Sequence, residues 1–78
     1  MRMPLFSYVF RPVNDTWVDV KGSEPVVLAD VLQSFDILID DRTQFARLYD
    51  YRRGLIIWYR AYGALKITID IWEMVDGI

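Results

Sequence analysis

Apolar and polar residues alternate over residues 16–21, as they do in a half-buried β-strand. Residues 5–13 and 16–21 are rich in aromatic and β-branched types, which favour strands. Asn14 and Asp15 separate these two runs, and both residue types favour tight turns. We therefore predict a β-hairpin here, with Pro12 at an edge or a bulge because proline lacks the N–H that a ladder needs.

The next segment has a helical period. Ser23 is a good N-cap, Glu24 suits the positive end of the helix dipole, and Pro25 is tolerated in a first turn. Apolar residues then recur every three or four positions, and polar residues fall on the other side of the helix. The pattern predicts an amphipathic helix over about 24–36 whose apolar face lies in the core. The residues of that face are Val27, Leu28, Val31, Leu32 and Phe35.

Residues 41–53 fit either a helix or a strand. Asp41 and Gln44 have the spacing of a capping box, and the two arginines and the glycine at 52–54 are typical of a helix end. We favour the helix and keep the strand as the alternative. The residues that would share a helical face are Phe45, Leu48, Tyr49 and Arg52, and those that would share one face of a strand are Phe45, Arg47, Tyr49 and Tyr51.

The last third of the chain has the clearest pattern, that of a second hairpin. Large aliphatic residues occupy every second position from 65 to 71, and residues 55–60 form another run of strand-favouring types. Gly63, in the link between them, can take the positive φ of a hairpin turn. We predict a single α+β domain over 1–78 in the order β-β-α-(α)-β-β, a small antiparallel sheet of about four strands with one or two helices on one face.

The predicted sheet carries more large apolar side chains than one or two helices can cover. If Ile57 and Tyr59 share the face of Ile67, then Ile56 and Trp58 lie on the opposite face, and a slip of one residue exchanges the two sets. In either register, bulky side chains remain on the face away from the helix. An apolar face that is exposed to solvent promotes aggregation, and small domains often bury such a face by forming oligomers. We therefore predict a homodimer or a tight complex with another protein; the alternative is that the second helix covers the surplus.

Charge is divided unevenly along the 78 residues. The net charge of −2 excludes a generally basic nucleic-acid coat and a highly acidic mimic of DNA. Residues 1–41 have a balance of −4, residues 42–66 one of +5, and residues 67–78 one of −3. The basic segment is interleaved with aromatic residues, and most basic residues of the chain are Arg. Arg and aromatic residues are enriched at protein interfaces, where Lys is depleted.

Two functions could use such a segment. In a protein-interaction module, the rings supply contact area and the guanidinium groups bind carboxylates of a protein partner. In a nucleic-acid or nucleotide-binding module, the same groups bind phosphates and stack on bases. We favour the first function and keep the second as the alternative; in a third interpretation, the Arg residues pair with Asp within the chain and the rings lie in the core. The residues predicted to bind the partner are Arg47, Tyr49, Arg52, Arg53, Trp58, Tyr59 and Arg60.

The sequence offers few groups for catalysis or for a cofactor. With no Cys and no His, it has no thiolate zinc site, no disulfide, no Cys nucleophile and no His-based triad. Two acidic clusters could supply oxygen ligands to Mg²⁺ or Ca²⁺, but we interpret them as caps and solvated residues. We therefore expect no enzyme activity, no metal and no cofactor. The clusters are Asp36, Asp40 and Asp41, and Asp70, Glu73 and Asp76.

No segment has the roughly 20 apolar residues that a membrane-spanning helix needs, and no cleavage site follows the apolar residues 3–10. We therefore expect a cytoplasmic protein with no membrane partner, although the absence of Cys is compatible with either redox state. In its small size, its lack of catalytic residues and its Asp-, Tyr- and Trp-rich composition, the chain loosely resembles small phage-encoded proteins that bind and disable a host machine. The resemblance implies an inhibitor of viral origin, although no motif carries it.

Overall fold

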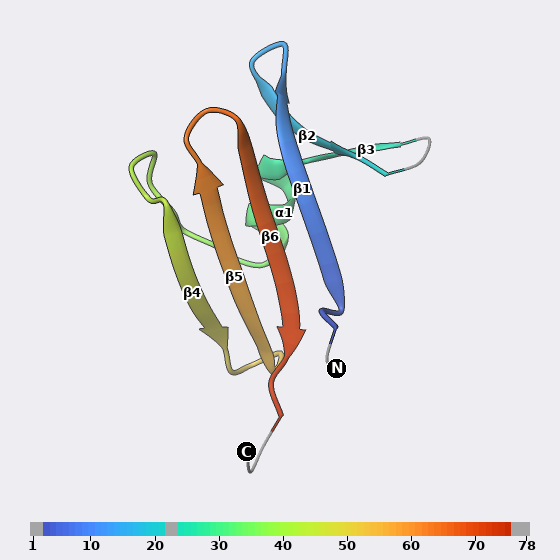
Figure 1. Ribbon diagram of the computed structural model, residues 1–78. Helices are drawn as coiled ribbons and strands as arrows, with labels where there is room; N and C mark the ends of the chain where they lie inside the picture. Colours follow the sequence, from blue (N-terminus) through green and yellow to red (C-terminus); the bar gives the residue numbers. More distant parts are fainter. Residues whose placement is uncertain (1–2, 22–23, 76–78) are drawn as a thin grey trace.

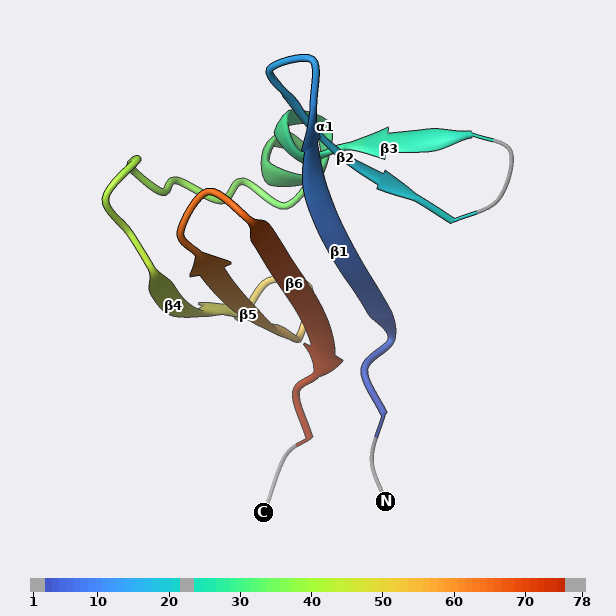
Figure 2. The same cartoon turned by 45° about the horizontal axis from the view of Figure 1, so that its top comes forward.

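The computed structural model describes residues 3–21 and 24–75 of the chain. The elements are β1 Phe6–Val13, β2 Thr16–Val20, β3 Pro25–Val27, α1 Leu28–Ser34, β4 Phe45–Asp50, β5 Leu55–Tyr62 and β6 Lys66–Glu73. The six strands form one antiparallel sheet in the order β3-β2-β1-β6-β5-β4, and α1 lies behind it (Figure 1). The hairpin of β2 and β3 turns away from the four other strands (Figure 2).

Both predicted hairpins are confirmed. β1 pairs with β2, and Asn14 and Asp15 between them have φ values of 49° and 64°. A two-residue type I′ turn requires this left-handed conformation at both positions. β5 pairs with β6, and Gly63 in their turn has a φ of 57°. Pro12 lies where β1 extends beyond its pairing with β6, which stops at Phe10, so its predicted edge position is also confirmed.

The first predicted helix is shorter than expected, because its first turn is a strand. Pro25, Val26 and Val27 pair with β2, and α1 begins only at Leu28. Val27 takes the N-cap position with an extended backbone, and no side-chain hydrogen bond caps the helix there. Two consecutive β-branched residues favour a strand, and proline is tolerated because β3 is at the edge of the sheet. The predicted N-cap, Ser23, lies outside the described residues.

The helix α1 ends in a Schellman motif. The N–H of Ile37 donates to the carbonyl oxygen of Leu32 at 2.8 Å, and the N–H of Asp36 donates to that of Gln33 at 3.2 Å. Asp36 takes the left-handed position of the motif with a φ of 55°, which Asp adopts more readily than most residues. Ile37 is buried in the core. The segment after α1 therefore continues on the side of the sheet that α1 covers (Figure 1).

The second predicted helix is wrong, and the strand alternative is correct. Residues 45–50 form β4, which pairs along its whole length with β5. Ala46 and Leu48 pack against the core, and the residues between them face the other side. A helix at this position would have left the outer side of β5 without a strand partner. Pairing with β5 therefore selects the strand for a segment whose own pattern fits both structures.

The predicted capping box at Asp41 is replaced by a turn around Asp40. The Oδ1 atom of Asp40 accepts a hydrogen bond from the N–H of Arg42 at 2.8 Å and one from the hydroxyl of Thr43 at 3.0 Å. These bonds lower the pKa of the Asp40 carboxyl, the bond from Arg42 contributing most. They form an Asx turn, which directs the chain into β4 instead of starting a helix.

The core lies between the sheet and the layer formed by α1 and the segment that follows it. Ile57 pairs with Ile71 and Tyr59 with Ile69, so odd-numbered residues of β5 and β6 share the core face. Of the two registers considered for this hairpin, the structure therefore has the one that places Trp58 on the opposite face. The buried residues of the core are Phe10, Leu28, Val31, Ile37, Ile57, Tyr59, Ile67, Ile69 and Ile71.

The predicted α+β class agrees with this architecture, although the sheet is larger than expected. It has six strands instead of four, and the described residues contain one helix. The two additional strands, β3 and β4, come from segments that were assigned to helices, and they form the two edges of the sheet. None of the described residues belongs to a helix long and apolar enough to cross a membrane.

Candidate functional site

One face of the sheet is covered by no described element, and we call it the open face. It points away from α1, and its residues alternate with core residues along β1, β4, β5 and β6. Trp58, for example, lies on β5 between Arg47 of β4 and Asp70 of β6. The open face consists of Ser7, Val9, Arg11, Phe45, Arg47, Tyr49, Ile56, Trp58, Arg60, Tyr62, Lys66, Thr68, Asp70 and Trp72.

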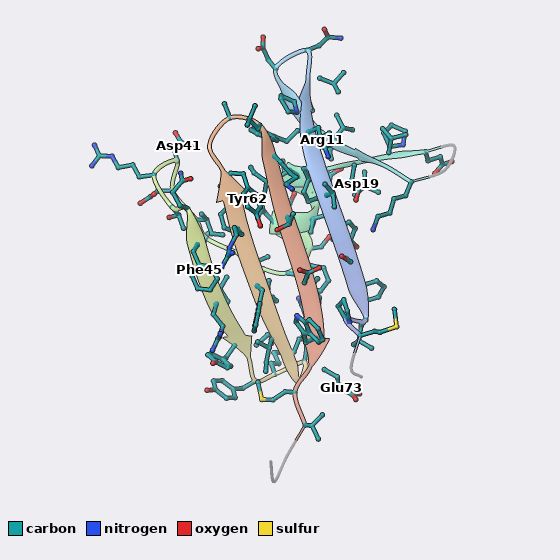
Figure 3. All side chains as sticks on the ribbon, viewed as in Figure 1. Arg11, Asp19, Asp41, Phe45, Tyr62 and Glu73 are labelled. Carbon is teal, nitrogen blue, oxygen red and sulfur yellow. The ribbon has the colours of Figure 1, made fainter. Side chains whose placement is uncertain are left out.

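Four aromatic rings on the open face are exposed to solvent by more than a third of their surface. The exposed fractions are 47% for Phe45, 49% for Tyr49, 39% for Trp58 and 42% for Tyr62. Phe45 and Tyr62 lie over neighbouring strands in Figure 3, in which α1 is behind the sheet. Complete burial of one large apolar side chain is worth about 1.5–3 kcal/mol. The rings therefore give the open face a tendency to associate with another surface.

Basic side chains lie over these rings. The guanidinium carbon of Arg47 is 4.6 Å from the centroid of the Trp58 ring, and that of Arg60 is 5.0 Å from the centroid of the Phe45 ring. The Nζ atom of Lys66 is 4.4 Å from the centroid of the Tyr62 ring. Each contact is a cation–π interaction worth about 0.5–1 kcal/mol at an exposed site. These contacts hold the cations on the open face before any partner binds.

The open face is electropositive, although the chain has a net charge of −2. Four basic residues stand against one acidic residue, Asp70, whose Oδ1 accepts a hydrogen bond from the hydroxyl of Ser7 at 2.6 Å. Several of the other acidic residues, such as Asp36, Asp40 and Asp41, follow α1 on the opposite side of the sheet. An anionic partner is therefore attracted to the open face and repelled by the other side.

A small depression of about 150 Å³ lies on the open face. It is smaller than the 300–1,000 Å³ of a typical small-molecule site, so its size suits a single side chain of a partner. Trp72 lies in the same surface, with its ring centroid 6.0 Å from that of Trp58. The buried Nε1–H of Trp72 has no acceptor among the described residues. The side chains that line the depression from the open face are Phe45, Trp58, Arg60, Tyr62, Thr68 and Asp70.

The structure brings together only part of the predicted binding residues. Tyr59 lies on the core face, where it is 6% exposed and pairs with Ile69. Burial raises the pKa of its hydroxyl, and the nearby Asp41 carboxylate adds to this shift. Tyr59 is separated from Trp58 because neighbouring residues of a strand point to opposite faces. The four predicted residues that do share the open face are Arg47, Tyr49, Trp58 and Arg60.

Arg52 and Arg53 lie in the turn between β4 and β5, away from the open face. The Nη1 group of Arg53 donates a hydrogen bond to the carbonyl oxygen of Ser34 at 2.9 Å, at the C-terminal end of α1. The same guanidinium group lies 3.5 Å from carboxylate oxygens of Asp36 and Asp50. For Arg53, the interpretation as an intramolecular partner of Asp is therefore the correct one. Its contacts connect the end of the helix to the edge of the sheet.

Three open-face residues that make cation–π contacts were missing from the predicted set: Phe45, Tyr62 and Lys66. The alternation of residues 45–49 could have identified Phe45, because Phe45 and Arg47 lie on one face of a strand. Tyr62 and Lys66 face each other across the β5–β6 hairpin. Once the register of the hairpin was known, this pair could have been identified, because it lies two residues beyond the pair of Arg60 and Thr68.

The two acidic clusters do not form a metal site in the described part of the chain. Asp40 holds the turn before β4, and Asp36 ends α1 and pairs with Arg53. Asp70 accepts the hydrogen bond from Ser7. Asp76 lies outside the described residues. These carboxylates are therefore spread over separate local structures, and most of them already have hydrogen-bond or ionic partners.

Comparisons of the chain with models of protein families, with curated proteins and with solved structures gave no match. Function therefore has to be inferred from the chemistry of the molecule itself. The open face is the surface on which that chemistry is concentrated, because its rings and cations come from four different strands and meet only in the folded sheet.

Proposed function

We propose that this chain is a non-enzymatic protein-interaction module that docks an acidic surface of a partner protein on its open face. The observation that carries the proposal is the presence, on one uncovered face, of partly exposed aromatic rings with basic groups stacked on them. Trp, Tyr and Arg dominate the binding energy of protein interfaces. A small phage-type inhibitor of a host machine would be one module of this kind.

Trp58 and Arg47 would form the centre of the interface. Trp58 lies on β5 with a strand on either side, so a partner that covers the sheet would remove its ring from water in every direction. The guanidinium group of Arg47 is already placed over this ring. It would lose little side-chain entropy on binding, and its N–H groups could donate to a carboxylate of the partner.

The proposal is tested by the binding of the chain to two labelled probes, measured by fluorescence anisotropy. One probe is a peptide of alternating Glu and Leu, and the other is a single-stranded oligothymidylate. We expect the peptide to bind, and Trp58→Ala to weaken its binding about 30-fold, which corresponds to the roughly 2 kcal/mol of a hot-spot residue. Unchanged affinity of the Trp58→Ala variant, with the fold intact by circular dichroism, would contradict the proposal.

A matched pair of arginine variants separates the open face from general charge. Arg47→Ala and Arg42→Ala remove the same charge, but Arg42 is an exposed residue of the turn before β4 and lies outside the open face. We expect Arg47→Ala to weaken peptide binding by at least about tenfold and Arg42→Ala to change it by less than about twofold. Equal effects of the two variants would show that the peptide responds only to net charge.

A second candidate function is the binding of single-stranded nucleic acid on the same face. It is favoured by the arrangement of rings and cations on an open antiparallel sheet, on which bases could stack. The net charge of −2 opposes it. Binding to phosphates weakens steeply with salt, with a slope of about 0.7 per contacted phosphate for a single strand. Steeply salt-dependent binding of the oligothymidylate, without binding of the peptide, would replace the first proposal with the second.

The homodimer and the cytoplasmic location stay predictions. Two copies that met through their open faces would bring four basic residues of each against those of the other. Such like-charge contacts are unfavourable. We therefore assign the open face to an acidic target, and self-association would use the edge of β4 instead.

A further inference from the structure

The outer edge of β4 is an unprotected sheet edge. The strand has six residues, pairs regularly with β5 from Phe45 to Asp50 and contains no proline. The opposite edge of the sheet, β3, has three residues and begins with Pro25. Natural sheets shorten their edge strands, interrupt them with bulges or place proline in them, because an open edge pairs with other chains. β3 has two of these protections, whereas the protection of β4 is limited to the charges of Arg47 and Asp50.

The free backbone groups of β4 belong to alternate residues. The carbonyl oxygen of Gln44 accepts a hydrogen bond from the N–H of Ala61 at 2.8 Å, so the backbone groups of Gln44 and of every second residue after it face β5. Those of Phe45, Arg47 and Tyr49 face outward. No strand in the described part of the chain pairs with this side of β4. It therefore offers a row of donors and acceptors to an incoming strand.

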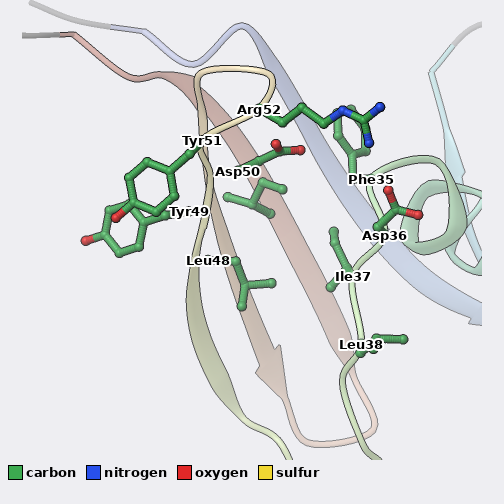
Figure 4. Close-up of a pocket in the computed structure, with 10 residues that line it drawn as sticks. Phe35, Asp36, Ile37, Leu38, Leu48, Tyr49, Asp50, Tyr51 and Arg52 are labelled. Carbon is green, nitrogen blue, oxygen red and sulfur yellow. The ribbon is translucent and has the colours of Figure 1, made fainter.

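A groove of about 430 Å³ runs beside this edge on the core side of the sheet (Figure 4). It lies between residues 35–38 and the end of β4, and Ile37, Leu48 and Ile57 give it an apolar lining. Side chains of an added strand point alternately to the two faces of the sheet. A strand that pairs with β4 would therefore place some side chains beside the groove and others on the open face, as in known strand-addition complexes.

We propose that this edge pairs with β4 of a second copy of the chain, antiparallel, about a twofold axis at Leu48. Two symmetric registers give the most overlap. With the axis at Arg47, the Arg47 residues of the two copies would lie directly opposite, and like charges in that position are destabilising. With the axis at Leu48, Arg47 of each copy lies opposite Tyr49 of the other, which replaces repulsion by two cation–π contacts. The charges of β4 therefore select the Leu48 register.

This pairing extends the sheet across both copies and leaves both open faces uncovered. Arg47 would then lie between Trp58 of its own chain and Tyr49 of the other, and the two Leu48 side chains would meet beside the grooves. The dimer therefore does not depend on the proposed docking function. It would bring the two open faces side by side, so that one partner could contact both.

The test compares the dimer dissociation constants of two variants, Tyr49→Glu and Tyr49→Lys, by sedimentation equilibrium of the full chain. Tyr49 is half exposed, and both new side chains are long and polar, so the fold is retained. In the Leu48 register, residue 49 of each copy lies opposite Arg47 of the other copy, so the dimer contains this contact twice. We expect the Lys variant to dissociate at least about fourfold more readily than the Glu variant. Leu65→Lys, at an exposed position of the β5–β6 turn, is the charge control and should leave dimerisation unchanged.

Equal dissociation constants for the two Tyr49 variants would overturn the Leu48 register, because residue 49 would then face Phe45 of the other copy. An unsubstituted chain that stays monomeric at millimolar concentration would overturn the dimer itself. Hydrogen exchange gives an independent check, since the amide protons of Arg47 and Tyr49 should become protected as the concentration rises. Trp58→Ala tests the open face and these variants test the edge, so either proposal can fail without the other.

Discussion

Asp19 is a buried carboxylate that holds β1 at the point where it separates from β2. It is 4% exposed, and its Oδ2 accepts a hydrogen bond from the N–H of Val9 at 2.8 Å. Backbone pairing of β1 with β2 begins only at Arg11 and Val18. The side chain of Asp19 therefore supplies to Val9 the acceptor that a neighbouring strand would otherwise supply. The substitution Asp19→Ala would leave this N–H without an acceptor.

The expected loss is about 1–3 kcal/mol of unfolding free energy, the contribution of a part-buried hydrogen bond to a charged acceptor. The Nζ atom of Lys21 is 3.7 Å from the same carboxylate oxygen, but the Lys21 side chain is 54% exposed. An ion pair to so exposed a cation adds between zero and about 1 kcal/mol. Because about 1 kcal/mol corresponds to 4–8 °C for a domain of this size, Asp19→Ala should lower Tm by at least about 4 °C.

The assay is thermal and urea unfolding of three variants, followed by circular dichroism. Asp19→Asn keeps a carbonyl acceptor for Val9 and should cost less than half as much as Asp19→Ala, and Lys21→Ala should cost less than about 1 kcal/mol. If Asp19→Asn and Lys21→Ala were each as destabilising as Asp19→Ala, the charge pair would be the stabilising contact. The account based on the hydrogen bond to Val9 would then be refuted.

Two further predictions follow from buried and paired side chains. Burial raises the pKa of Tyr59, so the unfolded chain loses this proton near pH 10 while the folded chain keeps it. The contribution of Tyr59 to the unfolding free energy is therefore fully present below about pH 10 and is lost as the pH rises through the folded pKa. In the Tyr59→Phe variant, the urea midpoint should lack this alkaline decline. An unchanged decline would contradict the assignment to Tyr59. Arg53→Ala should destabilise the chain by about 1 kcal/mol through loss of its bond to Ser34, whereas Arg52→Ala should stay within about 0.5 kcal/mol. Urea unfolding compares the two Arg variants, and an equal effect would show that Arg53 does not connect the helix to the sheet.

The sequence alone was sufficient for the elements whose partners are close along the chain. The turn at Asn14 and Asp15 and the glycine at 63 were read correctly, because a tight turn is determined by the few residues that form it. The alternation identified Ile67, Ile69 and Ile71 as the core face of β6, because a single period fits them, but Leu65 lies in the turn before β6 and is 77% exposed. The surplus of apolar residues on the sheet was also predictable, since it follows from composition and from the number of available helices.

The tertiary structure decided the segments whose local pattern fits two periods. Residues 45–50 satisfy a helix and a strand, and only pairing with β5, which follows later in the chain, selects the strand. Val26 and Val27 likewise continue a helical period, but they pair with β2 and form the edge strand beside it. Such a choice depends on a partner that the segment itself does not contain, so a local pattern cannot report it.

The membership of the candidate site also depended on the folded sheet. Arg47 and Trp58 are eleven positions apart and stack because they are cross-strand neighbours, whereas Trp58 and Tyr59 are adjacent and lie on opposite faces. Arg53 lies in the same basic segment but turns back to the end of α1. Residue types and charge are properties of the chain, and they indicated an Arg and aromatic surface. Which of those side chains share a face is a property of strand pairing, because pairing brings distant residues together and the pleat separates adjacent ones.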